Sequence, residues 1–314
     1  MKDKKIMITG GAGFIGSNMV EALIDQNEVT VVDNLSILDD RFIKKFYGMK
    51  NFTFEKKDIK DKLIDNDYDL IVHLAADSDV RNGASDPVID MNENVAGTVS
   101  ILEFMRRNDV KNMMFASSST VYGEASTIPT PEGYGPCMPI SSYGASKLSA
   151  ESFIYAYSHY YGIKADVYRF ANIVGKNSTH GVIFDFINKL KKDPSVLEVL
   201  GDGTQAKSYL HVTDCINAMF FIHDKANKTD MYNLGNDGVT NVDKIARYVL
   251  DAMGLKNTEI VHRGGVNGRG WKGDVKHTEM DVRKMLSFGW KNKYSSDDAV
   301  KKAVSEIKQQ MIGN

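Results

Sequence analysis

The stretch Lys5-Ile6-Met7-Ile8-Thr9-Gly10-Gly11-Ala12-Gly13-Phe14-Ile15-Gly16 decides the fold of this chain. Its apolar beginning predicts a buried strand, and after the last glycine the apolar residues between Met19 and Ile24 recur with helical spacing. Gly10, Gly13 and Gly16 lie between the two elements, where a tight turn needs residues without a side chain. A strand, glycine turn and helix in this order are typical of a site where a pyrophosphate lies against the backbone and the positive end of the helix.

Further short apolar runs follow, and helix-like segments separate most of them; the runs cover residues 29–32, 52–54, 70–72, 113–116 and 167–170. This alternation predicts an α/β fold, a doubly wound parallel (Rossmann) sheet with helices on both faces. The pattern loosens after residue 172, where helical spacing is found over 182–192, 213–225 and 296–310 and a short strand is expected over 231–234. We therefore expect an NAD-binding domain over 1–172, to which 211–235 returns, and a smaller mixed α/β lobe for the substrate over 173–210 and 236–314.

The choice of NAD follows from Asp33, which ends the second predicted strand 17 residues after Gly16. A carboxylate at this place can accept hydrogen bonds from the adenosine ribose, and it repels the 2'-phosphate of NADP. The alternative is a glycine turn that serves chain geometry alone, and the joint presence of strand, helix and carboxylate disfavours it.

Tyr143 and Lys147 lie four residues apart at the start of a predicted helix, so their side chains share one face. A nearby cation can lower the pKa of a phenol, ordinarily about 10, by about 1 to 3, which makes the phenol a better general base. Ser117, Ser118 and Ser119 end a predicted strand, at the sheet edge where ligands bind. The alternative for Tyr143 and Lys147 is a pair on the surface of a helix without a catalytic role, and the alternative for the serines is that they cap a turn or a helix.

Composition narrows the class of protein. The 314 residues include 39 basic and 41 acidic ones, a net charge of -2, and no basic stripe with interleaved aromatics, so we expect neither nucleic acid nor membrane as a partner. Two cysteines and the lack of a long apolar run favour a cytoplasmic protein without a membrane span. Among the histidines, only His211 has a cysteine, Cys215, at helical spacing, and two ligands do not make a zinc site. We predict no metal.

Taken together, these motifs resemble the extended short-chain dehydrogenases/reductases, in the group of nucleotide-sugar epimerases and dehydratases, with UDP-glucose 4-epimerases the nearest kind. The resemblance spans nearly the whole chain. Besides the glycine turn, it is carried by Asp33-Asn34, Asp58-Ile59, His73-Leu74-Ala75-Ala76, Asn94, 117–123, 143–147 and 201–205.

The resemblance implies a role for each matching residue. Tyr143 is the base, Ser118 the catalytic hydroxyl, and Lys147 holds the nicotinamide ribose and tunes Tyr143. The implied contacts of NAD are Gly10, Gly13, Phe14, Ile15, Gly16, Asp33, Asn34, Asp58, Ile59, Leu74, Ala75, Ala76, Asn94, Ser117, Tyr143 and Lys147. The implied contacts of the nucleotide-sugar substrate are Ser118, Asn172, Val182, Lys207, Arg269 and Thr278.

Two of the substrate contacts depart from the pattern of the group. Lys207 stands where epimerases usually have arginine, and Arg269 is displaced from the second arginine position. A lysine attracts a diphosphate but lacks the two-pronged geometry that orients it, and exposed solubilising charges are the alternative interpretation of both residues. Thr278 falls near the position that limits bulk at the sugar C2, so an N-acetyl group would fit.

The residue type at the position of Thr120 distinguishes the activities within the group. Its dehydratases and UDP-glucuronate decarboxylases carry an acidic residue two before the Val-Tyr-Gly tyrosine, where this chain has Thr120. We therefore expect 4-epimerisation of a UDP-hexose of the glucose/galactose type through a transient 4-keto sugar and NADH, with Tyr143 taking the proton of the 4-hydroxyl and Ser118 bridging. A dehydratase, decarboxylase or dehydrogenase, or a non-catalytic dinucleotide-binding module, are the alternatives.

The predicted helices over 86–107 and 143–162 resemble the pair that forms a four-helix interface between two copies in this group. Phe153, Ile154 and Tyr157 supply apolar residues on the second helix. We therefore expect a homodimer, although a helix packed on its own sheet has a similar spacing.

Overall fold

The computed structural model describes residues 1–80, 82–265, 270 and 275–312, which form two compact units. The first consists of Met1–Gly123, Gly135–Arg169 and Met219–Tyr232, and the second of Glu124–Tyr134, Phe170–Ala218 and Asn233–Asn314. The segment Glu124–Tyr134 was expected in the NAD-binding domain, but it packs with the second unit, as do residues 170–172, 211–218 and 233–235. There the Thr130 N–H donates to the carbonyl oxygen of Glu279 at 2.9 Å.

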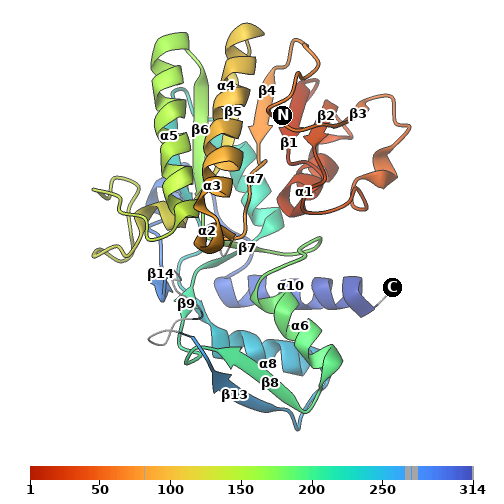
Figure 1. Ribbon diagram of the computed structural model, residues 1–314, viewed down its shortest axis with the longest axis vertical. Helices are drawn as coiled ribbons and strands as arrows, with labels where there is room; N and C mark the ends of the chain where they lie inside the picture. Colours follow the sequence, from red (N-terminus) through yellow and green to blue (C-terminus); the bar gives the residue numbers. More distant parts are fainter. Residues whose placement is uncertain (81, 266–269, 271–274, 313–314) are drawn as a thin grey trace. The chain divides into compact units, whose positions relative to one another are not determined.

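A seven-stranded sheet forms the first unit (Figure 1). The strand order is β11-β6-β5-β4-β1-β2-β3, and the strands are β1 (Lys5–Thr9), β2 (Glu28–Asp33), β3 (Phe52–Lys56), β4 (Leu70–His73), β5 (Asn112–Ser118), β6 (Lys164–Phe170) and β11 (Asp230–Leu234). β1 lies between β2 and β4, and it pairs with both in parallel. The order reverses at β1, because β2 and β3 follow on one side of it and β4, β5 and β6 on the other. The predicted doubly wound parallel sheet is confirmed.

Helices and short helical turns connect these strands; they are α1 (Phe14–Leu23), η1 (Lys44–Phe46), α2 (Asn82–Ser85), α3 (Pro87–Asp90), η2 (Met91–Ala96), α4 (Gly97–Arg107), η3 (Ser119–Tyr122), α5 (Ser142–Tyr161) and α7 (Val212–His223). Since crossovers between parallel strands are right-handed, the reversal of strand order puts α1 on one face of the sheet and α4 and α5 on the other. α4 and α5 run side by side (Figure 1).

The helix expected over 86–107 is interrupted. It consists of α3, the π-helical turn η2 and α4, in direct succession. A π turn adds a residue to the helical repeat and rotates the side chains that follow, and such turns are frequent at functional sites. Asn94 lies within η2.

α5 is positioned by its caps and by its apolar face. The Ser141 hydroxyl accepts a hydrogen bond from the Gly144 N–H at 3.1 Å, and Gly162 ends the helix in the left-handed region. Ile154 is fully buried in the core between the helices and the sheet. Ile154 therefore packs internally, whereas the sequence analysis counted it on a face toward a second copy. Tyr157 packs against the same core and donates to Glu103.

The second unit contains three small sheets, β10-β7, β12-β9-β14 and β13-β8, formed by β7 (Asn172–Val174), β8 (Val196–Leu200), β9 (Ala206–Lys207), β10 (Tyr209–His211), β12 (Thr240–Asn241), β13 (Glu259–Arg263) and β14 (His277–Thr278). Its helices are α6 (Val182–Lys192), α8 (Val242–Met253), α9 (Arg283–Ser287) and α10 (Ser296–Ile312). α6, α8 and α10 bury their apolar faces in one core with β8. Among the described helices of both units, none combines the length and the apolarity needed to cross a bilayer.

Candidate active site

The glycine turn lies where the strand order of the first unit reverses, which is where open parallel sheets bind ligands. β1 and β4 are neighbours there, and the Leu74 N–H donates to the carbonyl oxygen of Thr9 at 3.1 Å. Gly10 has a φ of +70°, and a Cβ on it would lie 2.7 Å from the backbone nitrogen of Ala75. Only glycine therefore allows the turn to lie against the end of β4, where Leu74, Ala75 and Ala76 are half-buried.

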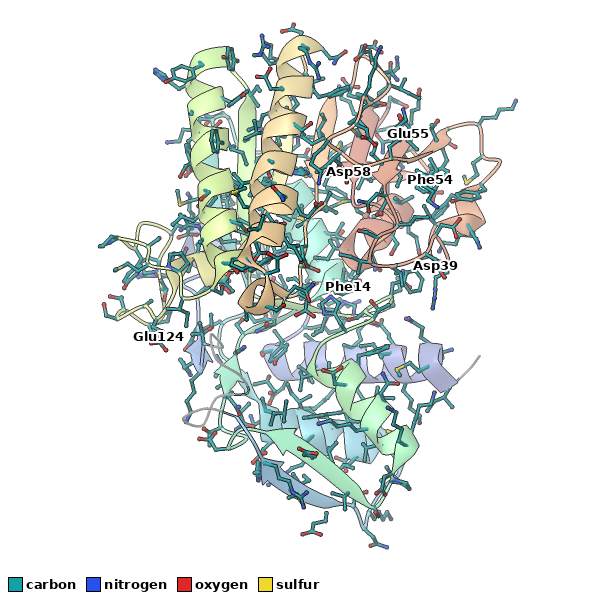
Figure 2. All side chains as sticks on the ribbon, in the orientation of Figure 1. Phe14, Asp39, Phe54, Glu55, Asp58 and Glu124 are labelled. Carbon is teal, nitrogen blue, oxygen red and sulfur yellow. The ribbon has the colours of Figure 1, made fainter. Side chains whose placement is uncertain are left out.

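The turn leads into the N-terminus of α1. A Cβ on Gly16 would overlap the carbonyl oxygen of Gly10, so this glycine allows the helix to pack on the turn. Among the described residues, no side chain caps Gly13 at the helix N-terminus. Phe14 and Ile15, the first two helical residues, are half-exposed (Figure 2 labels Phe14). The first N–H groups of α1 are thus available to a phosphate, and the helix dipole favours one.

Asp33, at the end of β2, is next to this turn. Its Oδ2 accepts the Ala12 N–H at 3.0 Å and its Oδ1 accepts the Leu35 N–H at 2.9 Å. A carboxylate has about four acceptor positions, so two remain for the hydroxyls of a ribose. Burial raises the pKa of Asp33, and the two backbone hydrogen bonds oppose this effect. A glycine turn, an open helix N-terminus and this carboxylate are the donor and acceptor set that fits NAD.

Asn34 and Asp58 extend this group of residues. The Asn34 side-chain amide donates to Asp58 Oδ2 at 3.0 Å, and Lys60 N–H donates to Asp58 Oδ1 at 2.9 Å (Figure 2 labels Asp58). Ile59 differs from its neighbours, because its side chain is 7% exposed and belongs to the core. Asp58 is therefore accessible to a ligand through its carboxylate, whereas the apolar side chain of Ile59 faces other protein atoms.

Tyr143 and Lys147 meet Ser118 at the same sheet edge, where β5 ends. The two side chains from α5 share one face, with Lys147 Nζ 5.8 Å from the centre of the Tyr143 ring. Lys147 Nζ also donates to the carbonyl oxygen of Ala116 on β5 at 3.0 Å and lies over the ring of Phe115. Ser118 forms a hydrogen bond with the Tyr143 phenol. The structure thus brings together the three predicted catalytic residues.

The predicted direction of the Tyr143 pKa is wrong for the polypeptide alone. Burial, with a smaller contribution from the carboxylates of Asp90 and Asp77, raises the pKa of the phenol to about 12, and the hydrogen bond with Ser118 opposes this rise. Burial also lowers the pKa of Lys147 to about 8, against the attraction of Glu151 and Asp90. Desolvation is the largest influence on both groups because both are removed from water, so a phenolate here needs further positive charge.

Asp77 and Asp90 were not found by the sequence analysis. Both are nearly fully buried. Asp90 accepts from the Ser142 hydroxyl at 2.6 Å, and the Asn94 amide donates to Asp90 at 3.1 Å and to the Ser146 hydroxyl at 2.9 Å. The amide oxygen of Asn94 accepts the Asp77 N–H at 2.9 Å. Asn94 therefore ties the π turn to α5 beside Tyr143, and no local pattern of spacing indicates this.

Ser117 has a different environment from Ser118. Its hydroxyl donates to Glu151, which is four residues after Lys147 and forms a buried ion pair with Arg169 at 2.6 Å. The guanidinium of Arg169 also lies over the ring of Tyr122, 4.7 Å from its centre. The side chain of Ser117 thus belongs to a buried polar network under the sheet edge, and the spacing of Lys147 and Glu151 is a signal that could have indicated it.

The predicted substrate residues lie in the second unit, except for Ser118. Asn172 begins β7, and its N–H donates to the carbonyl oxygen of Ser208 at 3.1 Å. Thr278 pairs with Lys207 in parallel, between β14 and β9. The backbone thus brings Asn172, Lys207 and Thr278 close together, and Val182 is the first residue of α6. Arg269 lies outside the described residues.

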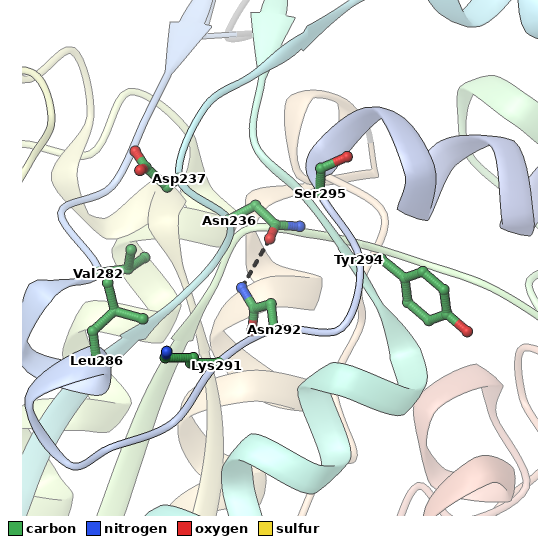
Figure 3. A pocket seen from close by; sticks show the side chains of 8 residues that line it. All are labelled: Asn236, Asp237, Val282, Leu286, Lys291, Asn292, Tyr294 and Ser295. Atoms are coloured by element: carbon green, nitrogen blue, oxygen red, sulfur yellow. Dashed lines mark hydrogen bonds between the residues drawn. The ribbon is translucent and has the colours of Figure 1, made fainter.

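A pocket of about 250 Å³ also lies in the second unit (Figure 3); it is lined by Asn236, Asp237, Val282, Leu286, Lys291, Asn292, Tyr294 and Ser295. None of the predicted substrate residues that the structure describes belongs to this lining. His211 forms a hydrogen-bonded pair with Glu306 at 3.0 Å. Within the part of the chain that is described, no group of three metal-ligating side chains occurs.

Comparisons with known proteins agree with this geometry. The model of the NAD dependent epimerase/dehydratase family matches residues 6–235. The chain is 33% identical to a Methanocaldococcus jannaschii protein named provisionally as a UDP-glucose 4-epimerase, over 96% of this chain and 98% of the relative. It is 37% identical to a UDP-galactose 4-epimerase of known crystal structure, with a TM-score of 0.87 and coverage of 98% and 99%.

A third similar protein carries a bound cofactor. The UDP-glucuronic acid 4-epimerase of Bacillus cereus was solved with UDP-glucuronic acid and NAD, and it has 26% identity, a TM-score of 0.88 and coverage of 98% of this chain and 99% of that chain. The family match covers more than two thirds of this chain and includes the glycine turn, Asp33, Ser118, Tyr143 and Lys147. The chain therefore belongs to the NAD-dependent epimerase/dehydratase family, an enzyme family that acts on nucleotide sugars, and NAD is its cofactor.

Proposed function

We propose that this protein interconverts the C4 epimers of a UDP-hexose, with glucose and galactose as the sugars. The observation that carries the proposal is the group of Tyr143, Ser118 and Lys147 at the same sheet edge as the glycine turn, with Tyr143 as the proton acceptor and no acidic side chain two residues before Tyr122. The similarity to a UDP-galactose 4-epimerase over nearly the whole chain supports the same activity.

Each residue of this group has a separate task. When bound, NAD would supply a hydride acceptor and donor for sugar C4. Tyr143 takes the proton of the 4-hydroxyl and gives it back at the end of the cycle. Lys147, whose pKa burial lowers to about 8, remains mostly cationic at neutral pH and supplies positive charge beside the phenol. Ser118 holds the phenol oxygen by its hydrogen bond.

Thr120 argues against dehydration and decarboxylation, which other members of the family perform. Elimination of water from the sugar needs a proton donor next to the base, and a threonine hydroxyl has too high a pKa to give up its proton. The buried carboxylates that act on Tyr143 are themselves engaged: Asp90 accepts from Ser142 and Asn94, and Asp77 accepts from Asn82. These contacts favour epimerisation.

The second unit supports a UDP-sugar as the substrate. We propose that Asn172 and Lys207 contact the diphosphate and that Thr278, next to Lys207, leaves room for a substituent on sugar C2. Val182, at the start of α6, and Arg269 complete the proposed contacts. The enzyme is then expected to accept UDP-N-acetylhexosamines as well as UDP-hexoses, and replacing Thr278 by tyrosine should exclude only the acetylated sugars.

The test is to incubate the purified enzyme with single UDP-sugars and separate the products. We expect UDP-glucose and UDP-galactose to reach the same mixture from either side, without accumulation of absorbance from reduced nicotinamide. Loss of water from the sugar would assign a dehydratase, release of carbon dioxide from UDP-glucuronate a decarboxylase, and steady accumulation of reduced nicotinamide a dehydrogenase. Any of these results, without C4 epimers, overturns the proposal.

We also propose that the enzyme is a homodimer formed through α4 and α5. The support is an exposed aromatic surface on α5, where Phe153, Tyr160 and Tyr161 are 43%, 71% and 41% exposed. Apolar surface of this kind marks a contact between proteins. Light scattering of the wild-type protein should give twice the mass of one chain, and Phe153→Glu should reduce the measured mass to that of one chain. A monomeric wild-type protein contradicts the proposal.

A further inference from the structure

Three hydroxyl groups form a chain of hydrogen bonds at the end of β5. Thr120 lies in η3, and its Oγ1 donates to Ser118 Oγ at 2.9 Å. The backbone N–H of Thr120 donates to the same oxygen at 3.2 Å, because Ser118 caps the N-terminus of η3. Ser118 in turn forms a hydrogen bond with the Tyr143 phenol. The hydrogen bonds thus lead from Thr120 to Ser118 and from Ser118 to Tyr143.

The hydroxyl of Ser118 has two acceptor positions and one proton. Both hydrogen bonds from Thr120 use acceptor positions, so the remaining capacity of Ser118 is its proton. Because the interaction with Ser118 lowers the pKa of Tyr143, we assign the proton of Ser118 to the Tyr143 oxygen. A hydroxyl in this state can donate to a phenolate but has no position left to receive the proton of a sugar hydroxyl.

We propose that Thr120 is a positioning residue, which holds Ser118 as a permanent hydrogen-bond donor to the Tyr143 oxygen, so that Tyr143 receives the proton of the sugar 4-hydroxyl directly. The inference rests on the proposed epimerase function and deepens it. It corrects the expectation that Ser118 bridges the proton, since a bridge has to accept one proton while it gives another. It also assigns a task to the residue that replaces the acid of the dehydratases.

The consequence is measurable at Tyr143. A donor that is itself held by two hydrogen bonds binds a phenolate more strongly, so the loss of one of them weakens the bond and raises the pKa of the phenol, on the order of half a pKa unit. The other charged groups that act on Tyr143 among the described residues are Lys147 on α5, Asp90 on α3 and Asp77 after β4. They are unchanged in the variants below, so they act equally on all of them.

The test compares Thr120→Val, which keeps the shape and the N–H but removes the hydroxyl, with Thr120→Ser, which restores the hydroxyl. Ser119→Ala is the control, because it removes a neighbouring hydroxyl that takes no part in this series of hydrogen bonds. The phenolate absorbance of the NAD-loaded proteins is titrated, with Tyr143→Phe subtracted, and kcat is measured against pH. We expect Thr120→Val to move both midpoints upward by about half a unit, and Thr120→Ser and Ser119→Ala to leave them in place.

A merely structural role of Thr120 would lower kcat equally at every pH without moving the midpoint, and that result overturns the proposal. Unmoved titration and kcat midpoints in a folded Thr120→Val protein overturn it as well. The titration needs no substrate, so it tests the role of Thr120 independently of the proposed epimerase function. If the wild-type enzyme epimerises no UDP-sugar but its phenolate titration responds to Thr120→Val, the proposed function fails and the role of Thr120 stands.

Discussion

The ion pair of Glu151 and Arg169 leads to a prediction on stability. The side chains are each 4% exposed, and two hydrogen bonds join them, Nη2 to Oε2 at 2.6 Å and Nε to Oε1 at 2.9 Å. Glu151→Gln keeps the shape but leaves the guanidinium charge of Arg169 buried without its partner. Breaking a buried pair in this way costs about 3 to 5 kcal/mol of unfolding free energy.

The expected change in melting temperature follows from the length of the chain. An unfolding entropy of about 2.1 cal/mol/K per residue gives about 0.7 kcal/mol/K for 314 residues, so the loss corresponds to a drop of about 5 to 8 °C. The control is Glu21→Gln. Glu21 pairs with Lys45 at the same distance of 2.6 Å, but with side chains 39% and 55% exposed, and such a pair contributes less than about 1 kcal/mol.

Thermal and urea unfolding of the two variants check the prediction, and a second readout ties it to the site. Glu151 raises the pKa of Lys147, so Glu151→Gln should lower this pKa further and move the alkaline loss of activity to lower pH. The double variant Glu151→Met/Arg169→Met should be more stable than Glu151→Gln, because no charge is left unpaired. Equal stability of Glu151→Gln and Glu21→Gln would refute the reasoning.

Three further predictions concern the cofactor and the base. Tyr143→Phe should lower turnover about 10²- to 10⁴-fold with NAD still bound, and full activity would remove Tyr143 from the mechanism. NAD affinity should fall as the pH rises through about 8, where Lys147 loses its charge, and Lys147→Met should abolish this pH dependence. The contribution of Lys147 to the free energy of unfolding should instead rise from about pH 8 to 10.5, because the unfolded chain binds more protons than the folded chain in this range. Unfolding measured at both pH values checks this. Asp33→Asn should reduce the preference for NAD over NADP at least about tenfold in binding assays, since the repulsion of the 2'-phosphate is lost; an unchanged preference contradicts this role.

Most of the sheet was predictable from the sequence, because its central strands, such as β1 and β4, are buried on both faces and form short apolar runs. The run at residues 6–8 lies within β1, and the helix expected over 182–192 has the bounds of α6. The proposed catalytic residues could be picked out for a different reason. Ser118, Tyr143 and Lys147 each belong to a short local motif, and the parallel sheet brings the carboxyl ends of its strands to one edge.

The remaining features depend on contacts between segments far apart in the chain. Asn94 lies 52 residues from Ser146, and its hydrogen bond to that residue is invisible in local spacing. For the same reason the π turn was expected as a regular helix.

The sequence by itself determined the fold class and the NAD motif and indicated the proposed base, because periodicity and short motifs are properties of neighbouring residues. Only the tertiary structure decided the electrostatics of the site, where burial raises the pKa of Tyr143 although a lysine lies one helical turn away. Only the folded chain also showed that Thr120 donates to Ser118. Desolvation and hydrogen-bond direction depend on everything that surrounds a group, and this environment exists only once the chain has folded.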